Sequence, residues 1–206
     1  MDATKKITVF SYRRCPFAMR VRMTLHEKNI IFETREEKWG AFSQELKEKH
    51  PEAKVPVLVH GDTVIYESAI ITEYIEDAFP EPALLSQDPK QRAKMRLWTY
   101  WCNHVFKPHV DHYKYGTARS KAEDVEKAPD NLRKDLEKLE QTLVKQAYLL
   151  GDTISLADIH VFPFLRQLNK VNPRLASLDE CPATLQWLNK LLARPAFEKT
   201  MEKKNA

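Results

Sequence analysis

Cys15 is the residue of this sequence best placed to act as a nucleophile, because a proline follows it directly. Pro16 is typical of the first position of a helix, so Cys15 is expected just before a helix begins. There it would face unpaired backbone N–H groups and the positive end of the helix dipole. We therefore expect a pKa below the ordinary cysteine value, with Arg13 and Arg14 acting in the same direction if they fold back. The alternative is a helix-capping cysteine without chemistry.

A second cysteine is missing from the position where a dithiol site would need one. Ala18 occupies the place that would close a Cys-x-x-Cys pair. A mixed disulfide formed on Cys15 must then be opened by a thiol from solution. The other cysteines, Cys102 and Cys181, are widely spaced, and three cysteines make a poor disulfide framework. The pattern predicts a single-thiol cycle in a reducing compartment.

Two further residue pairs have the chemistry to hold a peptide-like ligand. A cis bond between Val55 and Pro56 would turn the Val55 backbone outward, where an extended peptide can pair with it. A trans proline on an edge strand is the alternative, and the sequence alone does not decide. Ser68 is expected as the N-cap of a helix, which would create an anion site, and Glu67 beside it would hold an amino group. Taken alone, this pair is also consistent with a plain helix cap.

The elements that would position these residues change character along the chain. Alternating and β-branched patterns predict strands at 7–12, 30–34, 55–59 and from residue 64. Helical spacing predicts helices from Pro16 to about Asn29, around 42–49 and from Ser68, followed by about five more. The expected fold class is α/β plus all-α, with an α/β domain over residues 1–80, a linker over 81–89 and an all-helical bundle domain over 90–206.

Composition and charge exclude several classes of protein. With 206 residues, 43% hydrophobic and 30% charged, the chain is typical of soluble globular proteins. A formal net charge of +4 is too small to indicate a nucleic-acid partner. No apolar run approaches the roughly 20 residues of a membrane helix, and no signal peptide is expected. We therefore expect a cytoplasmic protein with neither nucleic acid nor membrane as a partner.

Histidines supply the only candidates for a metal site. His104, His109 and His112 lie close together in sequence, but Pro108 interrupts their helix. No cysteine–histidine or carboxylate–histidine spacing supports zinc. We expect no metal.

The motifs together resemble the glutathione transferase superfamily over nearly the whole chain. The segments that carry the resemblance are Cys15-Pro-Phe-Ala-Met-Arg-Val-Arg22, Lys54-Val-Pro-Val-Leu58, Tyr66-Glu-Ser-Ala-Ile-Ile71 and Ser155-Leu-Ala-Asp-Ile159. The first half is similar to the omega class through Cys15-Pro16-Phe17 and to the plant tau class through Met19-Arg-Val-Arg22. The resemblance implies a thioredoxin-like N-terminal domain in the order βαβαββα, glutathione as co-substrate, and a homodimer.

The resemblance also implies a role for individual residues. Cys15 would meet the glutathione sulfur, and Asp158 would cap a helix of the second domain. The implied glutathione-binding residues are Phe17, Lys54, Val55, Glu67 and Ser68. A pocket for the second substrate is expected between the domains, with candidate walls at Tyr12, Arg14, Trp101, His104 and Tyr115.

Cysteine at position 15 decides the reaction that the resemblance implies. Tau-like enzymes carry a serine there, which activates glutathione for conjugation. A cysteine instead forms a mixed disulfide. The expected function is glutathione-dependent thiol transfer, as deglutathionylation or dehydroascorbate-type reduction, on a small or glutathionylated co-substrate. Two alternatives stay open: conjugation of glutathione to electrophiles, and a non-enzymatic adaptor or regulatory protein.

Overall fold

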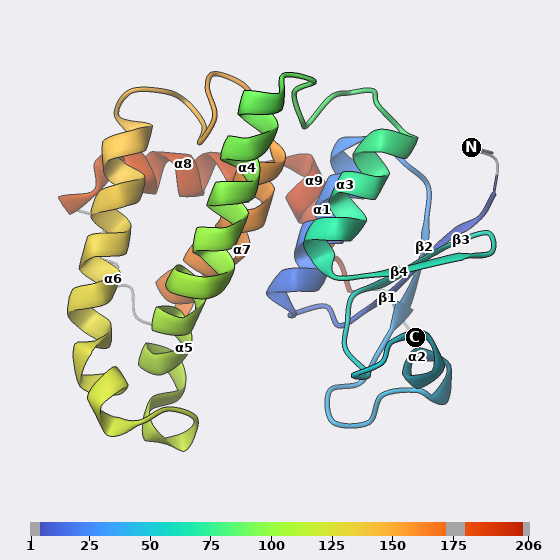
Figure 1. Cartoon of the computed structure of the whole chain (residues 1–206), viewed down its shortest axis with the longest axis horizontal. Coiled ribbons are helices and arrows are strands. Elements are labelled where there is room, and N and C mark those ends of the chain that lie inside the picture. The colour runs from blue at the N-terminus through green and yellow to red at the C-terminus, as the bar shows by residue number, and fades with distance from the viewer. Residues whose placement is uncertain (1–4, 172–179, 204–206) are drawn as a thin grey trace. The chain divides into compact units, whose positions relative to one another are not determined.

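The computed structural model describes residues 5–171 and 180–203, which form two compact units (Figure 1). The first unit contains the chain up to Leu85 and the segment from Arg194, and the second runs from Ser86 to Ala193. The boundary between Leu85 and Ser86 lies within the expected linker of 81–89.

The end of the chain differs from the expected helical domain of 90–206. Its last helix, α9 (Pro195–Met201), packs on α1 (Pro16–Glu27) in the first unit. Arg194 donates from Nε and Nη2 to the two carboxylate oxygens of Glu27, at 2.5 and 2.7 Å. This paired contact of Arg194 with Glu27 attaches the segment to α1.

A four-stranded sheet forms the centre of the first unit. Its strands are β1 (Ile7–Ser11), β2 (Glu33–Glu36), β3 (Val57–His60) and β4 (Thr63–Tyr66), in the spatial order β2-β1-β3-β4. β1 pairs in parallel with β2, and β3 runs antiparallel to both β1 and β4. With α1, α2 (Gln44–Lys49) and α3 (Ser68–Ala78), the element order confirms the expected βαβαββα.

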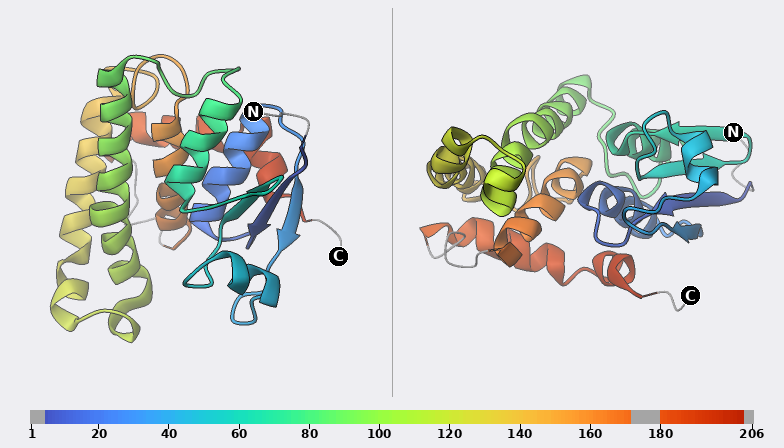
Figure 2. Two further views of the ribbon diagram at one scale, coloured as in Figure 1. Left: turned by 45° about the vertical axis from the view of Figure 1, so that its right-hand side comes forward. Right: turned by 90° about the horizontal axis from the view of Figure 1, so that it is seen from below.

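The two faces of this sheet are covered by different helices (Figure 2). Successive side chains of a strand point to opposite faces. Ile7 and Val9 therefore share one face, where they form a core with residues of α1 and α3. Phe10 belongs to the other face and packs with Leu46 of α2. α1 and α3 contact each other on the first face, so the two helices that begin at Pro16 and Ser68 are held side by side.

The second unit is helical. Its elements are α4 (Pro89–Trp101), the π-helical turn η1 (Cys102–Phe106), α5 (Lys107–Tyr115), the 3-10 turn η2 (Gly116–Ala118), α6 (Ala122–Leu143), α7 (Leu156–Val171) and α8 (Pro182–Leu192). Pro108, expected to bend or end a helix, follows the wider turn η1, and α4, η1 and α5 continue into one another. Over residues 5–171 and 180–203, no helix combines the length and apolarity needed to cross a membrane.

Asp158 joins three segments of the second unit from a fully buried position. Its Oδ1 accepts hydrogen bonds from the Leu149 N–H and the Trp187 Nε1–H, both at 2.9 Å. Its Oδ2 accepts from the Ser155 N–H at 2.9 Å and from the Ser155 hydroxyl at 2.7 Å. The carboxylate thus reaches back to the start of α7, which confirms the capping role expected for it.

Candidate functional site

Cys15 is the N-cap residue of α1, as its position before Pro16 predicts. Its backbone N–H donates to the carbonyl oxygen of Tyr12 at 2.9 Å, which closes the turn between β1 and α1. The side chain is half-buried, and its Sγ lies 3.9 Å from the carbonyl oxygen of Val55. The fold therefore brings together two of the segments that the sequence singled out.

The Val55–Pro56 peptide bond is cis. The sequence pattern left this open, with a trans proline as the alternative. Val55 precedes β3 and is half-buried, while Pro56 is buried. The carbonyl group of this cis peptide bond is therefore the one that lies 3.9 Å from the Cys15 sulfur.

The acidity of Cys15 differs from the prediction. Burial raises the pKa of its thiol, and this effect exceeds the opposing ones of the Ala18 and Phe17 backbone N–H groups and of the Arg22 and Arg20 charges. The prediction of a lowered pKa is therefore wrong for this structure. The helix N-terminus does favour the thiolate, but removing the sulfur from water costs the charged form more.

Neither of the two arginines expected to assist Cys15 folds back onto it. Arg13 donates from Nη1 to the carbonyl oxygen of Met201 in the C-terminal segment, at 3.4 Å. Arg14 donates from Nε to the Tyr12 hydroxyl at 3.2 Å, and its guanidinium lies 6.0 Å from the centre of that ring. The cationic contribution to Cys15 comes instead from α1 itself.

Arg22 is a buried residue of this site that the sequence reasoning missed. Its Nη2 donates to the Arg13 carbonyl oxygen at 2.7 Å, and its Nη1 donates to the Ser11 hydroxyl. Burial lowers the pKa of Arg22 to about 10, which leaves the guanidinium charged at neutral pH. Arg22 thus holds the turn before Cys15 and keeps a positive charge near the sulfur.

Arg20 is the second site residue that was missed, and it links Phe17 to Ser68. The guanidinium is fully buried and lies 5.0 Å from the centre of the Phe17 ring. Its Nη1 donates to the Ser68 hydroxyl at 3.2 Å. The available sequence signal was the Met19-Arg-Val-Arg22 motif, which places two cations in an otherwise apolar part of a helix.

Ser68 is buried and is the first residue of α3 rather than its N-cap. The predicted cap position was wrong by one residue, because Glu67 occupies it. Glu67 has a φ of 67°, in the left-handed region that residues other than glycine rarely adopt. Its side chain is exposed. A strained backbone at a residue with an exposed carboxylate, next to a buried hydroxyl, is an arrangement found at binding sites.

Lys54 is exposed and forms an ion pair with Glu52. A hydrogen bond between the two side chains raises the pKa of Lys54 and lowers that of Glu52. Beside them His50 is buried, with its Nδ1 accepting from the Glu52 N–H at 3.0 Å and its ring 4.8 Å from that of Tyr66. Burial lowers the pKa of His50.

The remaining candidates lie in the second unit and have partners there. Trp101 stacks on Phe106 with ring centres 5.2 Å apart, and His104 lies 4.4 Å from the Tyr100 ring. Tyr115 is covered by the cations of Lys114 and Arg119, at 4.6 and 4.1 Å. That Trp101, His104 and Tyr115 line a co-substrate pocket with Tyr12 and Arg14 stays a prediction.

His109 shares a hydrogen bond of 2.7 Å with Asp135. Burial raises the pKa of Asp135. Within the described residues, no group of three or more histidine, cysteine, aspartate or glutamate side chains is arranged to hold a metal ion.

Both units of the chain match known protein families. Residues 9–83 match the family model for the glutathione S-transferase N-terminal domain, and residues 101–195 match that for the C-terminal domain. Glutathione S-transferase U28 of Arabidopsis thaliana is 30% identical, over 95% of this chain and 88% of its own. Glutathione S-transferase omega-1 of Sus scrofa is 28% identical, over 92% and 78%. The crystal structure of the tau-class enzyme MiGSTU from mango superposes with a TM-score of 0.84 at 28% identity, over 96% and 93% of the two chains.

Proposed function

Because the chain belongs to the glutathione S-transferase family, we propose that it binds glutathione in its first unit and uses Cys15 for glutathione-dependent thiol transfer. The observation that carries the proposal is the position of the Cys15 sulfur. It lies at the start of α1, half-buried, and 3.9 Å from the Val55 carbonyl oxygen beside a cis proline. A serine there would have no sulfur with which to form a disulfide.

The proposed glutathione site follows the chemistry of the tripeptide. The Val55 backbone would pair with the cysteinyl residue, as an added strand does. The α-carboxylate of the γ-glutamyl end would meet the N-terminus of α3 at Ser68, and Glu67 would hold the amino group. Phe17 would line the sulfur, and Lys54 would leave Glu52 to reach the glycyl carboxylate. Exchange of one exposed ion pair for another costs little.

The proposed cycle has two exchange steps. The Cys15 thiolate attacks the glutathionyl sulfur of a glutathionylated substrate, which forms a Cys15–glutathione disulfide and releases the substrate as a thiolate. The thiolate of a second glutathione then attacks the glutathionyl sulfur of that disulfide. Glutathione disulfide leaves, and Cys15 returns as a thiolate. In net, one glutathione thiol is consumed for each substrate disulfide reduced, and it leaves joined to the glutathionyl group of the substrate as glutathione disulfide, so atoms and electrons balance.

Burial and the nearby arginine charges act on the Cys15 thiol in opposite directions. Arg22 and Arg20 favour the thiolate, although burial outweighs them and raises the thiol pKa. A thiol of high pKa is mostly protonated at neutral pH, but its thiolate is a strong nucleophile. We therefore expect the rate of the first step to keep rising as the pH increases above neutral.

The test compares wild type with Cys15→Ser on two substrates. A glutathione mixed disulfide reports thiol transfer, an aryl halide reports conjugation, and calorimetry gives glutathione affinity for each protein. Thiol transfer predicts that Cys15→Ser loses activity on the mixed disulfide while glutathione binding is retained. Cys181→Ser is the matched control, because Cys181 also precedes a proline at the start of a helix, and it should keep full activity.

Other results would contradict the proposal. Aryl-halide activity in wild type with none on the mixed disulfide would indicate conjugation. Absence of glutathione binding in both proteins would favour an adaptor. We also propose that the protein is a cytoplasmic homodimer. Analytical ultracentrifugation measures its oligomeric state.

A further inference from the structure

The turn between β1 and α1, residues 12–15, is held at Arg13 by two charged side chains. The Arg13 backbone N–H donates to Oε1 of Glu36 at 2.6 Å, and the Arg13 carbonyl oxygen accepts from Nη2 of Arg22 at 2.7 Å. Glu36 is the last residue of β2, and Arg22 belongs to α1. One residue of the turn is thus fixed from both sides, two positions before Cys15.

The register of the sheet brings Glu36 to this turn. β1 and β2 are parallel, and Ser11, the last residue of β1, pairs with Glu36. The Glu37 N–H donates to the Ser11 carbonyl oxygen at 2.7 Å, which extends the pairing by one bond. Because the two strands end together, the Glu36 side chain reaches the backbone N–H that lies two residues beyond β1.

The two charged groups support each other as well as the turn. Burial lowers the pKa of Arg22, and the charge of Glu36 is the largest of the effects that oppose it. A carboxylate makes a stronger hydrogen bond to a backbone N–H than a neutral acceptor does. The charges that act on the Cys15 thiol are those of Arg22 and Arg20, both from α1. The influence of Glu36 on the sulfur therefore runs through the position of the turn.

We propose that Glu36 is a positioning residue for Cys15, which holds the Arg13 N–H and so keeps the sulfur half-buried beside the Val55 carbonyl oxygen. This inference rests on the thiol-transfer function proposed above and deepens it. The Cys15 N–H closes the same turn by donating to the Tyr12 carbonyl oxygen at 2.9 Å. A displacement of Arg13 is therefore passed on to Cys15.

Loss of this contact should change two properties of the sulfur in opposite directions. A sulfur that is no longer held in place reacts more slowly with a bound mixed disulfide, because alignment of the reacting atoms is lost. The same sulfur gains contact with water, and since burial is what raises the pKa of the Cys15 thiol, that pKa should fall toward the ordinary value. Cys15 should then react faster with a small alkylating agent at neutral pH.

The test compares wild type with Glu36→Ala, Glu36→Gln and the matched control Glu33→Ala. A glutamine at position 36 keeps an oxygen that can accept from the Arg13 N–H. Glu33 lies on the same strand, but its carboxylate pairs with Lys6 and Arg35. The control therefore removes a glutamate and its ion pairs from β2 without removing the contact with the turn.

We expect Glu36→Ala to lower kcat on a glutathione mixed disulfide by about tenfold, while glutathione affinity measured by calorimetry is unchanged. Alkylation by iodoacetamide, followed by mass spectrometry of the peptide that contains Cys15, should become faster at neutral pH. Glu36→Gln and Glu33→Ala should stay within about threefold of wild type in both assays, because the first keeps the hydrogen bond and the second loses only exposed ion pairs.

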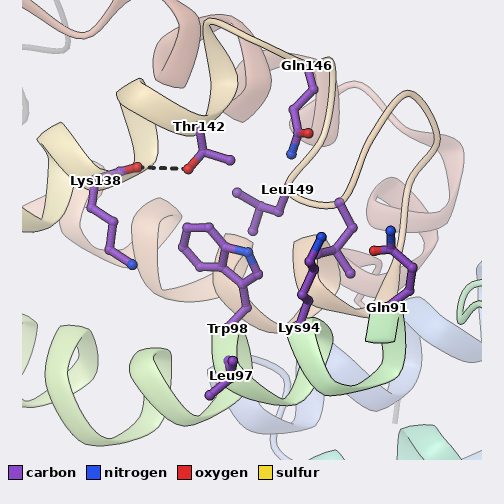
Figure 3. A pocket seen from close by; sticks show the side chains of 9 residues that line it. Gln91, Lys94, Leu97, Trp98, Lys138, Thr142, Gln146 and Leu149 are labelled. Atoms are coloured by element: carbon purple, nitrogen blue, oxygen red, sulfur yellow. Dashed lines mark hydrogen bonds between the residues drawn. The ribbon is translucent and has the colours of Figure 1, made fainter. Parts of the chain in front are cut away.

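Fluorine NMR of 5-fluorotryptophan protein shows whether the turn moves. The Trp39 ring centre lies 6.1 Å from that of Tyr12, so the Trp39 resonance should shift in Glu36→Ala. Trp98 lines a pocket in the second unit together with Lys94 and Leu149 (Figure 3). Its resonance is the reference and should stay in place.

Three results would overturn the proposal. The first is a Glu36→Ala protein that matches Glu33→Ala in both kcat and alkylation rate. The second is a Glu36→Gln protein that loses as much kcat as Glu36→Ala, since charge rather than the hydrogen bond would then matter. The third is a change of kcat and alkylation rate in the same direction, which would indicate a general loss of structure. Failure of the thiol-transfer function itself is distinguishable, because wild type would then be inactive on the mixed disulfide while alkylation and NMR still report on the turn.

Discussion

Lys28→Met removes the cation from an ion pair enclosed in the first unit. The Lys28 Nζ lies 2.8 Å from Glu76 Oε2, and the two side chains are 0% and 2% exposed. The same ammonium donates to the carbonyl oxygens of Phe79 and Pro82, at 2.6 and 2.7 Å. The variant would leave a buried carboxylate without a counter-charge, which costs about 3–5 kcal/mol. We expect the free energy of unfolding of the first unit to fall by about that amount.

Glu76→Gln is a milder change to the same pair. Glu76 Oε1 accepts from the backbone N–H groups of Leu84 and Leu85 at 3.0 and 3.3 Å, and the amide oxygen of a glutamine can keep these bonds. Lys28 then lacks its counter-charge but retains two carbonyl partners. We expect a smaller loss than for Lys28→Met, and we expect K28M/E76Q to lose less than the sum of the single variants, because the two side chains contact each other.

Urea unfolding followed by ¹⁹F NMR of 5-fluorotryptophan protein measures the effect unit by unit. Trp39 reports the first unit and Trp187 the second. Lys5→Met is the matched control, because its ion pair with Asp62 is exposed and its loss should cost less than about 1 kcal/mol. A change for Lys28→Met no larger than that of the control would show that water reaches the pair, and the reasoning from burial would fail.

Two further predictions concern acidity and packing. Burial raises the pKa of Cys15, so its alkylation by iodoacetamide should keep accelerating at pH values above the ordinary thiol pKa. Arg22→Gln should shift this pH profile further upward, and Arg14→Gln should leave it in place. A pH profile at or below that of a free thiol would contradict this prediction. Asp158→Ala should destabilise the second unit by about 3 kcal/mol or more in urea, since four hydrogen bonds to its carboxylate are lost; a change below about 1 kcal/mol would contradict it.

Much of the fold followed from local patterns in the sequence. The two-residue period of Ile7 and Val9 and the proline at position 16 determine a strand and a helix start without reference to distant residues. The attachment of α9 to α1 could not be predicted in this way. It depends on the pairing of Arg194 with Glu27, which are far apart in the chain and carry no mark of being partners.

In the candidate site, too, the features set by local sequence were predicted, and those set by distant residues were not. The N-cap position of Cys15 is local and was predicted, and the segments of Cys15 and Val55 do meet. The direction of its pKa shift was not predictable, because desolvation depends on everything that packs around the sulfur. For the same reason the sequence pointed to Arg13 and Arg14, which directly precede Cys15. The charge that opposes the rise in the Cys15 pKa comes instead from Arg22, further along α1.

A comparison within the chain shows how far local geometry determines the chemistry of a thiol. Cys181 is, like Cys15, an N-cap residue followed by proline at the first position of a helix. Burial raises the pKa of both thiols, but the carboxylates around Cys181, Glu140 first among them, raise its pKa further, whereas Arg22 opposes the shift at Cys15. Glu140 also accepts hydrogen bonds from the first N–H groups of that helix, which occupies donors that would otherwise favour a thiolate. The same two-residue motif is thus surrounded by anions in one unit and by cations in the other. The difference comes from charges that the tertiary fold brings to each helix start, so it is the buried arginines of α1, more than the Cys-Pro pair, that distinguish Cys15 as the candidate nucleophile.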